Sequence, residues 1–188
     1  MQKLEIHFVD SIAEIGAGAW NELAGTDNPF TRYEFLHALE QTGCTTAATG
    51  WAPHHVAVYA LAGKRKTLAA IMPLYLKTNS YGEYVFDWSW ASAYQSHGYE
   101  YYPKFVSAVP FTPSVGSRLF VRESASRPEI TRLIRDKVIE KAESIGASSW
   151  HILFPLEDEH DDFDHLGISS RIASQFHWYN KSYTSFDD

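Results

Sequence analysis

The chain has 188 residues, of which 45% are hydrophobic and 21% are charged, proportions typical of a globular domain rather than a disordered segment. Its one cysteine, Cys44, excludes an internal disulfide framework, and its longest apolar run, Val56–Ala62, is far shorter than the roughly 20 residues of a membrane helix. Six of the acids behind the net charge of −7 lie between Glu157 and Asp164, and no basic stripe or tail occurs, which argues against nucleic-acid binding. We therefore expect a soluble, cytoplasmic protein.

Apolar periodicity and capping signals predict strands that alternate with helices. In the first half we expect, in chain order, a strand over Leu4–Val9, a helix from Ser11 to about Ala24, a helix from Thr31 to Gly43, and a hairpin of Val56–Ala62 and Thr67–Lys77. In the second half we expect strands over Lys104–Phe111 and Arg118–Val121, a helix from Pro128 to Gly146, a strand over Ser149–Phe154, an acidic helix ending near Gly167, and a strand over about Ser170–Trp178. This order predicts an α/β domain, a mixed sheet flanked by helices in three layers.

The stretch Tyr81–Tyr102 is unusually aromatic, because nine of its 22 residues are Phe, Trp or Tyr against 15% for the whole chain. Core or lid packing explains such rings, since each buries a large apolar area. Glu83 and Asp87 also lie in this stretch, however, and Lys104 follows closely. Aromatic walls with a few placed charges are what a polar small ligand needs, so partial ligand contact is the alternative interpretation.

Nine histidines raise the question of a metal site. No pair has the His-x-x-x-His or Cys-x-x-Cys spacing of a zinc site, so we expect no bound metal. His151 and His177 each lie on the polar face of a predicted strand. If these two strands are neighbours, the imidazoles line one cleft and serve as base or hydrogen-bond donors. A structural role for each histidine is the alternative.

The turn Ser114–Ser117 is the one candidate for a phosphate-binding loop. Such loops work because consecutive backbone amides at a helix N-terminus point at the anion. Here the turn contains one glycine and leads into a predicted strand rather than a helix. A plain turn is therefore the favoured interpretation.

Two segments carry specific motifs, Tyr81–Trp88 with Tyr-Gly-Glu-Tyr-Val-Phe-Asp-Trp and Gln175–Trp178 with Gln-Phe-His-Trp. Further segments keep the same order along the chain: Asn28-Pro29-Phe30 with Glu34-Phe35-Leu36, Gly50–His55, Pro73–Lys77, Tyr101–Lys104, Pro110–Pro113, His151–Pro155 and Tyr183–Asp187, of which those that contain proline are weaker. Together these segments resemble the FemAB-like, GNAT-related acyltransferase family of bacteria, and the resemblance covers most of the chain.

The resemblance implies an acyl-CoA N-acyltransferase (GNAT)-like fold and transfer of an acetyl or aminoacyl group to an amine acceptor, such as a peptidoglycan precursor. The implied acyl donor is acetyl-CoA or aminoacyl-tRNA. The Arg/Gln-x-x-Gly-x-Gly/Ala loop of acetyltransferases is missing. We therefore expect residues 1–188 to form a single domain that supplies mainly the acceptor pocket. By the same resemblance we expect this to be the N-terminal domain of a longer two-domain protein, inactive without its C-terminal half. An incomplete domain leaves a sheet edge or an apolar face uncovered, so we also expect that the isolated chain can form a homodimer.

Seven residues are candidates for this chemistry. We expect His151 and His177 to act as base or hydrogen-bond donors, and substrate to contact Tyr84, Asp87, Trp88, Tyr101 and Lys104. The residues that bind a cofactor are not identified by the sequence. The alternative function is a non-catalytic module that binds a peptide or glycopeptide in an aromatic groove, and a purely structural domain would bind no small molecule.

Overall fold

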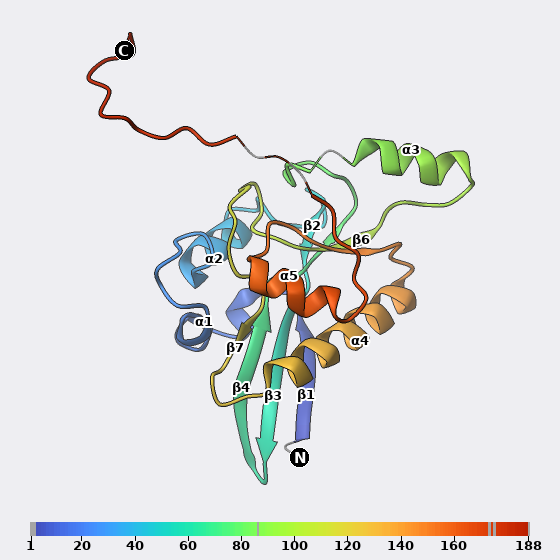
Figure 1. The fold of residues 1–188 in the computed structure, drawn as a ribbon. Coiled ribbons are helices and arrows are strands. Elements are labelled where there is room, and N and C mark those ends of the chain that lie inside the picture. The colour runs from blue at the N-terminus through green and yellow to red at the C-terminus, as the bar shows by residue number, and fades with distance from the viewer. Residues whose placement is uncertain (1–2, 86, 173, 175, 188) are drawn as a thin grey trace.

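The computed structural model describes residues 3–85, 87–172, 174 and 176–187, and within them it contains two four-stranded sheets (Figure 1). The first sheet is antiparallel and has the order β1 (Lys3–Val9), β3 (His55–Ala62), β4 (Arg65–Met72), β7 (Phe120–Val121). The second has the order β2 (Trp51–Pro53), β5 (Tyr75–Lys77), β6 (Lys104–Ser107), β8 (Trp150–Ile152), and only its β6–β8 pair is parallel.

The two sheets follow one another along the same pair of chain segments. β2 leads into β3 through His54, and β4 leads into β5 through Pro73 and Leu74. The His54 amide donates to the Leu74 carbonyl at 2.8 Å, which keeps the segments side by side at the junction. Proline has no amide hydrogen for the ladder. The strand predicted over Thr67–Lys77 is therefore divided into β4 and β5.

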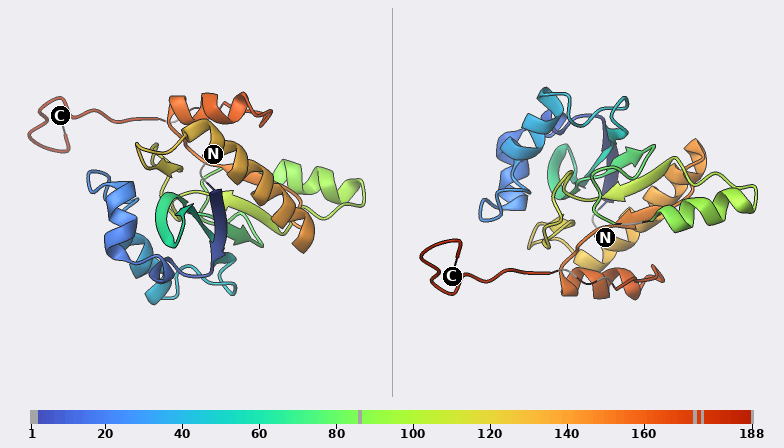
Figure 2. Two further views of the ribbon diagram at one scale, coloured as in Figure 1. Left: turned by 90° about the horizontal axis from the view of Figure 1, so that it is seen from below. Right: turned by 90° about the horizontal axis from the view of Figure 1, so that it is seen from above.

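Helices lie on both faces of the first sheet (Figure 2). On one face, α1 (Ala17–Ala24) and α2 (Tyr33–Gln41) contribute Trp20 and Leu36 to a buried cluster with the sheet. On the other face, α4 (Arg127–Ile145) and α5 (Glu157–Asp164) form the main core with it. These layers confirm the predicted α/β class, a mixed sheet flanked by helices.

The long helix α4 forms as the sequence predicts. Pro128 occupies its first turn, where a missing amide hydrogen costs nothing, and Gly146 ends it in the left-handed conformation at φ 70°. Ile130, Ile134 and Val138 recur at helical spacing and are fully buried against the sheet. The apolar face predicted for this helix is therefore its packing surface.

Two helix starts differ from the prediction. Ser11 and Glu14 do form a capping box, but it closes only the 3₁₀ turn η1 (Ile12–Glu14). Gly16 then adopts φ +85°, which interrupts the right-handed helix before α1 begins. The second helix begins at Tyr33 rather than at Thr31.

The predicted last strand is wrong for the residues that the structure describes. Its described residues are exposed and form no strand, including Ile172 and Phe176, and the segment extends away from the body (Figure 1). Alternating side chains supply a strand pattern, but a strand also needs a neighbour to pair its amides and carbonyls. Gln175 and Phe86, which belong to the two specific motifs, lie outside the described residues.

The aromatic stretch contains a helix that the sequence pattern did not predict, α3 (Trp88–Ser96). None of its residues is buried, and the helix projects from the body (Figure 1).

The next strand, β6, ends at Ser107, whereas the prediction extended it to Phe111, which adopts φ +59°. The short strand β2 was also missed, because three residues give too little alternation to detect.

Candidate functional site

Two lysines occupy one face of the second sheet. Lys77 of β5 and Lys104 of β6 are register partners, so their side chains lie on the same face, and both are fully buried. Trp51 is the partner of Lys77 on the other side, and His151 of β8 lies on this face one register step further along. Strand alternation thus gathers two ammonium groups and one imidazole on one buried surface.

Two carboxylates from the segment after β5 complete a buried charge cluster, which consists of Lys77, Glu83, Asp87 and Lys104. Lys104 Nζ donates to Glu83 Oε2 at 2.9 Å and to Asp87 Oδ2 at 2.5 Å. Glu83 and Asp87 are only 3% and 1% exposed. Their other oxygens, Glu83 Oε1 and Asp87 Oδ1, find no hydrogen-bond partner in the described part of the chain. Since buried polar atoms are normally paired, these two oxygens are acceptors that the described part of the cluster leaves unused.

The two carboxyl groups differ in their proton affinity. Burial raises the pKa of Glu83, and the nearby Lys104 only partly offsets that effect. Burial also opposes ionisation of Asp87, but the hydrogen bonds from Lys104 and Tyr101 help to outweigh it, and the pKa of Asp87 is lowered. Within the cluster, Glu83 is therefore the carboxyl group that takes a proton more readily.

Lys77 is held without a carboxylate contact among the described residues. Its Nζ donates to the Tyr81 carbonyl at 3.2 Å and lies 3.7 Å from the centre of the Trp51 ring. Trp51 Nε1 donates to the same carbonyl at 2.9 Å, so both side chains anchor the segment that leads to Glu83. Burial lowers the pKa of Lys77 to about 7. Sequence reasoning missed Lys77, because a lysine at the end of a short strand is usually exposed.

An aromatic cavity of about 370 Å³ adjoins the cluster. It is lined by Trp88, Ala91, Ser92 and Gln95 from one face of α3 and by the segment Tyr99–Tyr102. Glu100 is the one charged residue in this lining. Tyr101 belongs to both places, since it lines the cavity and donates from its hydroxyl to Asp87 Oδ2 at 2.7 Å. Aromatic faces beside carboxylates favour a cationic group.

The structure brings four of the seven candidate residues together. Asp87, Tyr101 and Lys104 share the hydrogen bonds of the cluster. The His151 ring lies 6.2 Å from the Tyr101 ring, and its Nε2 is hydrogen-bonded to Ser149 Oγ at 2.9 Å. Burial and the nearby Lys104 lower the pKa of His151 to about 4, so its imidazole is neutral at pH 7. His151 thus lies beside Tyr101 and the charge cluster. Its role as a base or hydrogen-bond donor stays a prediction.

The other three candidates are exposed. Trp88 lines the aromatic cavity with 63% of its surface accessible, while Tyr84 is 57% accessible at φ +57°. His177 lies in the C-terminal segment, where its ring stacks on that of Tyr179. The cleft predicted between two histidine-bearing strands does not form, because the described residues of 170–178 pair with no strand beside β8. A role for His177 also stays a prediction.

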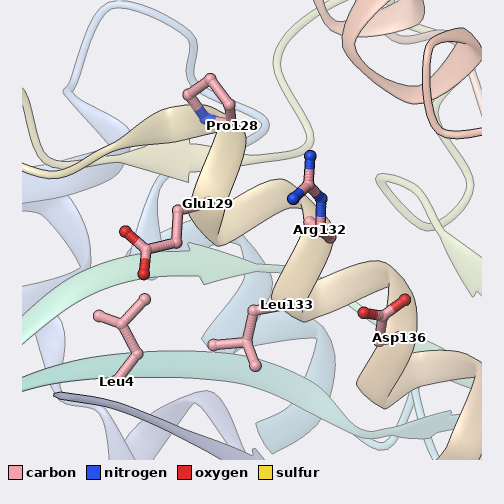
Figure 3. A pocket seen from close by; sticks show the side chains of 6 residues that line it. All are labelled: Leu4, Pro128, Glu129, Arg132, Leu133 and Asp136. Atoms are coloured by element: carbon pink, nitrogen blue, oxygen red, sulfur yellow. The ribbon is translucent and has the colours of Figure 1, made fainter. Parts of the chain in front are cut away.

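A second cavity, of about 450 Å³, lies between α4 and β1 (Figure 3). Leu4 and Leu133 form its apolar floor, and the side chains of Glu129, Arg132 and Asp136 are exposed around it. No buried charge lies among its lining residues. This hollow is therefore less suited to chemistry than the aromatic cavity.

The turn Ser114–Ser117 does not fit the diphosphate of a CoA donor. The Arg118 and Leu119 amides after it donate to the Glu159 carboxylate at 2.8 and 2.9 Å, and the Ser117 hydroxyl also donates to that carboxylate. Glu159 of α5 is itself fully buried. An internal carboxylate thus uses the amides that a phosphate group would need.

The described residues contain neither a membrane-spanning helix nor a cluster of metal ligands. None of the helices found in them is long and apolar enough to cross a membrane. They also hold no group of three or more His, Cys, Asp or Glu side chains placed to bind a metal ion.

Two solved structures superimpose on this chain with a broadly similar backbone path. Two aminoglycoside antibiotic 6'-N-acetyltransferases are similar, AAC(6')-Ih from Acinetobacter baumannii and AAC(6')-IG from Acinetobacter haemolyticus. The first is 13% identical with a TM-score of 0.49, covering 96% of this chain and 99% of its own. The second is 15% identical with a TM-score of 0.48, covering 95% and 99%. At these values no conclusion about substrate or activity follows.

Comparison of sequences identifies the family of the chain. No curated protein matches the chain. The model of the FemAB-like family, described as peptidoglycan biosynthesis/recognition, matches residues 11–188. That range includes both specific motif segments and every residue of the buried charge cluster. The protein therefore belongs to the FemAB-like family.

Proposed function

We propose that this protein is an N-acyltransferase whose aromatic cavity holds an amine acceptor. The observation that carries the proposal is the pair of buried carboxylates, Glu83 and Asp87, each with one oxygen that accepts no hydrogen bond from the described residues. A protonated amine is a natural partner for such oxygens, because charge-assisted hydrogen bonds are the strong ones. The family description, peptidoglycan biosynthesis/recognition, supports a peptidoglycan precursor with a free amine as the acceptor.

Each part of the site then has a role. The rings of Trp88 and Tyr101 contact the aliphatic stem of the acceptor, and Asp87 holds its ammonium group. Lys104 donates a hydrogen bond to each carboxylate, and its positive charge favours the ionised form of both. His151, neutral at pH 7, is a candidate base. The acyl donor is acetyl-CoA or aminoacyl-tRNA, the donors that the family resemblance implies, and this chain supplies the acceptor side.

A transfer assay tests the proposal directly. The full-length protein is incubated with each donor and with a peptidoglycan precursor that carries a free amine, and the product is identified by mass spectrometry. We expect Asp87→Asn to lower kcat/KM by roughly 100-fold, the order of a lost charge-assisted contact to the acceptor. Tyr33→Phe, which removes a hydroxyl from a half-buried tyrosine on α2, is the control. Wild-type protein that transfers neither acyl group contradicts the proposal.

The two histidines need their own variants. His151→Gln and His177→Gln are compared singly and together in the same assay. If the double variant transfers acyl groups as fast as wild type, neither imidazole belongs to the site.

A binding module is the second candidate function, because the family description names recognition as well as biosynthesis. It predicts that the aromatic cavity binds a muropeptide without turnover. Calorimetry with the same precursor separates the two functions, since binding without product formation in the presence of both donors supports the module alone.

A further inference from the structure

We propose that Tyr101, Asp87, Lys104 and Glu83 form a proton relay that carries a proton from the acceptor amine to Glu83. This inference rests on the proposed function. Three consecutive hydrogen bonds join the four groups: Tyr101 OH to Asp87 Oδ2 at 2.7 Å, Lys104 Nζ to Asp87 Oδ2 at 2.5 Å, and Lys104 Nζ to Glu83 Oε2 at 2.9 Å. Each distance is within the range of an ordinary or charge-assisted hydrogen bond, so protons can pass along the chain.

The relay begins at the aromatic cavity and ends in the interior. Tyr101 lines the cavity, whereas Asp87, Lys104 and Glu83 are all at least 97% buried. Bulk water therefore does not reach the inner groups readily, and Tyr101 links the cavity to them because it lines the cavity and donates its hydroxyl proton to Asp87. An amine is a nucleophile only after it loses a proton, so this transfer is a required step of acylation.

The step is balanced in protons. The ammonium gives one proton to the Tyr101 oxygen as the Tyr101 hydroxyl proton moves to Asp87. Asp87 passes that proton to Lys104 as Lys104 gives one to Glu83. The result is a neutral amine, an unchanged Tyr101 hydroxyl, an Asp87 carboxylate, a Lys104 ammonium and a Glu83 carboxylic acid. When the product leaves, the same chain returns the proton to water in the cavity.

The direction of the relay follows from the surroundings of its two carboxyl groups. Asp87 accepts hydrogen bonds from both Tyr101 and Lys104, which favour its ionised form, while Glu83 accepts only the one from Lys104. The other titratable groups close to Glu83 are Lys77 and Asp87, whose charges have opposite effects on it. A proton on the chain is therefore more stable on Glu83 than on Asp87.

Two variants interrupt the relay at opposite ends. Glu83→Gln removes the final proton acceptor, and Tyr101→Phe removes the entry hydroxyl while it keeps the ring. For both we expect kcat to fall on the order of 100-fold with KM changed less than about threefold, the size of a lost proton-transfer function. Glu123→Gln, on an exposed glutamate after β7, and Tyr33→Phe are the matched controls.

The solvent isotope effect on kcat separates a relay from mere support of the fold. In mixtures of H₂O and D₂O, wild type should show a curved dependence on deuterium content, because several protons move together. Tyr101→Phe should show a smaller effect with a linear dependence. Wild-type-like rates and curvature in both variants would overturn the relay while the transferase activity still stands.

Infrared spectroscopy gives a readout that needs no activity. A carboxylic acid band that is absent from Glu83→Gln should titrate in wild type at higher pH than an ordinary glutamate. If wild type transfers no acyl group, the proposed function is wrong and the relay falls with it, because the relay begins at the acceptor amine. If wild type transfers the group but Glu83 titrates as an ordinary glutamate, only the relay is overturned.

Discussion

Lys77 and Lys104 lie directly opposite each other on the antiparallel strands β5 and β6, and both side chains are fully buried. Like charges in directly opposed positions destabilise a sheet. The two lysines differ in their partners. Lys104 forms ion pairs with both Glu83 and Asp87, whereas Lys77 contacts the Trp51 ring and a backbone carbonyl. The lysine without a carboxylate is also the one whose pKa burial lowers to about 7.

Lys104→Met should lower the free energy of unfolding by about 3–5 kcal/mol, because it leaves two buried carboxylates without their counter-ion. Urea denaturation at pH 7 measures the change. The triple variant Lys104→Met/Glu83→Gln/Asp87→Asn, which removes the unpaired charges, should recover most of the loss. A single variant within about 1 kcal/mol of wild type would show that the ion pairs contribute little to stability.

The substitution Lys77→Met should stabilise the folded protein more at low pH than at high pH. The pKa of Lys77 lies near 7 in the folded protein against an ordinary 10.5, so the unfolded chain binds more protons between these values. Wild-type stability therefore rises from pH 7 to pH 10.5, and the advantage of the variant shrinks over the same window. We expect an advantage of about 1–3 kcal/mol at pH 6 by urea denaturation, the gain from replacing an unpaired buried charge with an apolar side chain. Lys64→Met, on the exposed turn, should show no such trend.

The substitution His151→Gln should remove the part of the wild-type protein's loss of stability in acid that arises from this histidine. Burial lowers the pKa of His151 from 6.5 to about 4, so the unfolded chain binds a proton that the folded chain rejects between these values. Wild type should thus lose about 1–2 kcal/mol through this residue as pH falls across that window, allowing for its partial exposure to solvent. Thermal unfolding at several pH values measures the slope. The exposed His97→Gln is the control, and an equal slope in both variants would contradict the prediction.

Glu159→Ala should destabilise the protein by about 2–4 kcal/mol, because it leaves two backbone amides and the Ser117 hydroxyl without their acceptor. Glu157→Ala removes an exposed glutamate from the first turn of the same helix and should change stability by less than about 0.5 kcal/mol. Urea denaturation compares the two. Similar values for both variants would mean that the buried carboxylate is not a structural anchor.

The sequence by itself determined the elements whose pattern is long and local. The apolar stripe of α4 repeats over several turns between a proline and a glycine, β1 alternates over seven residues, and β3 and β4 are β-rich runs of eight residues joined by a turn. Such patterns need no knowledge of distant neighbours. The α/β class followed from their order, and the motif segments indicated the family that the comparison confirmed.

Only the tertiary structure decided which side chains meet. Asp87, Tyr101 and Lys104 were candidates from composition and resemblance, but their shared hydrogen bonds depend on how the segment after β5 folds over β6. Lys77 joined them because strand register places it opposite Lys104, and Glu83 joined them because the segment after β5 brings its carboxylate to Lys104 Nζ. His177 was separated from His151 because its segment found no strand to pair with. A strand pattern is a property of one segment, whereas register, burial and charge pairing are properties of two segments packed together, and these decided the candidate site.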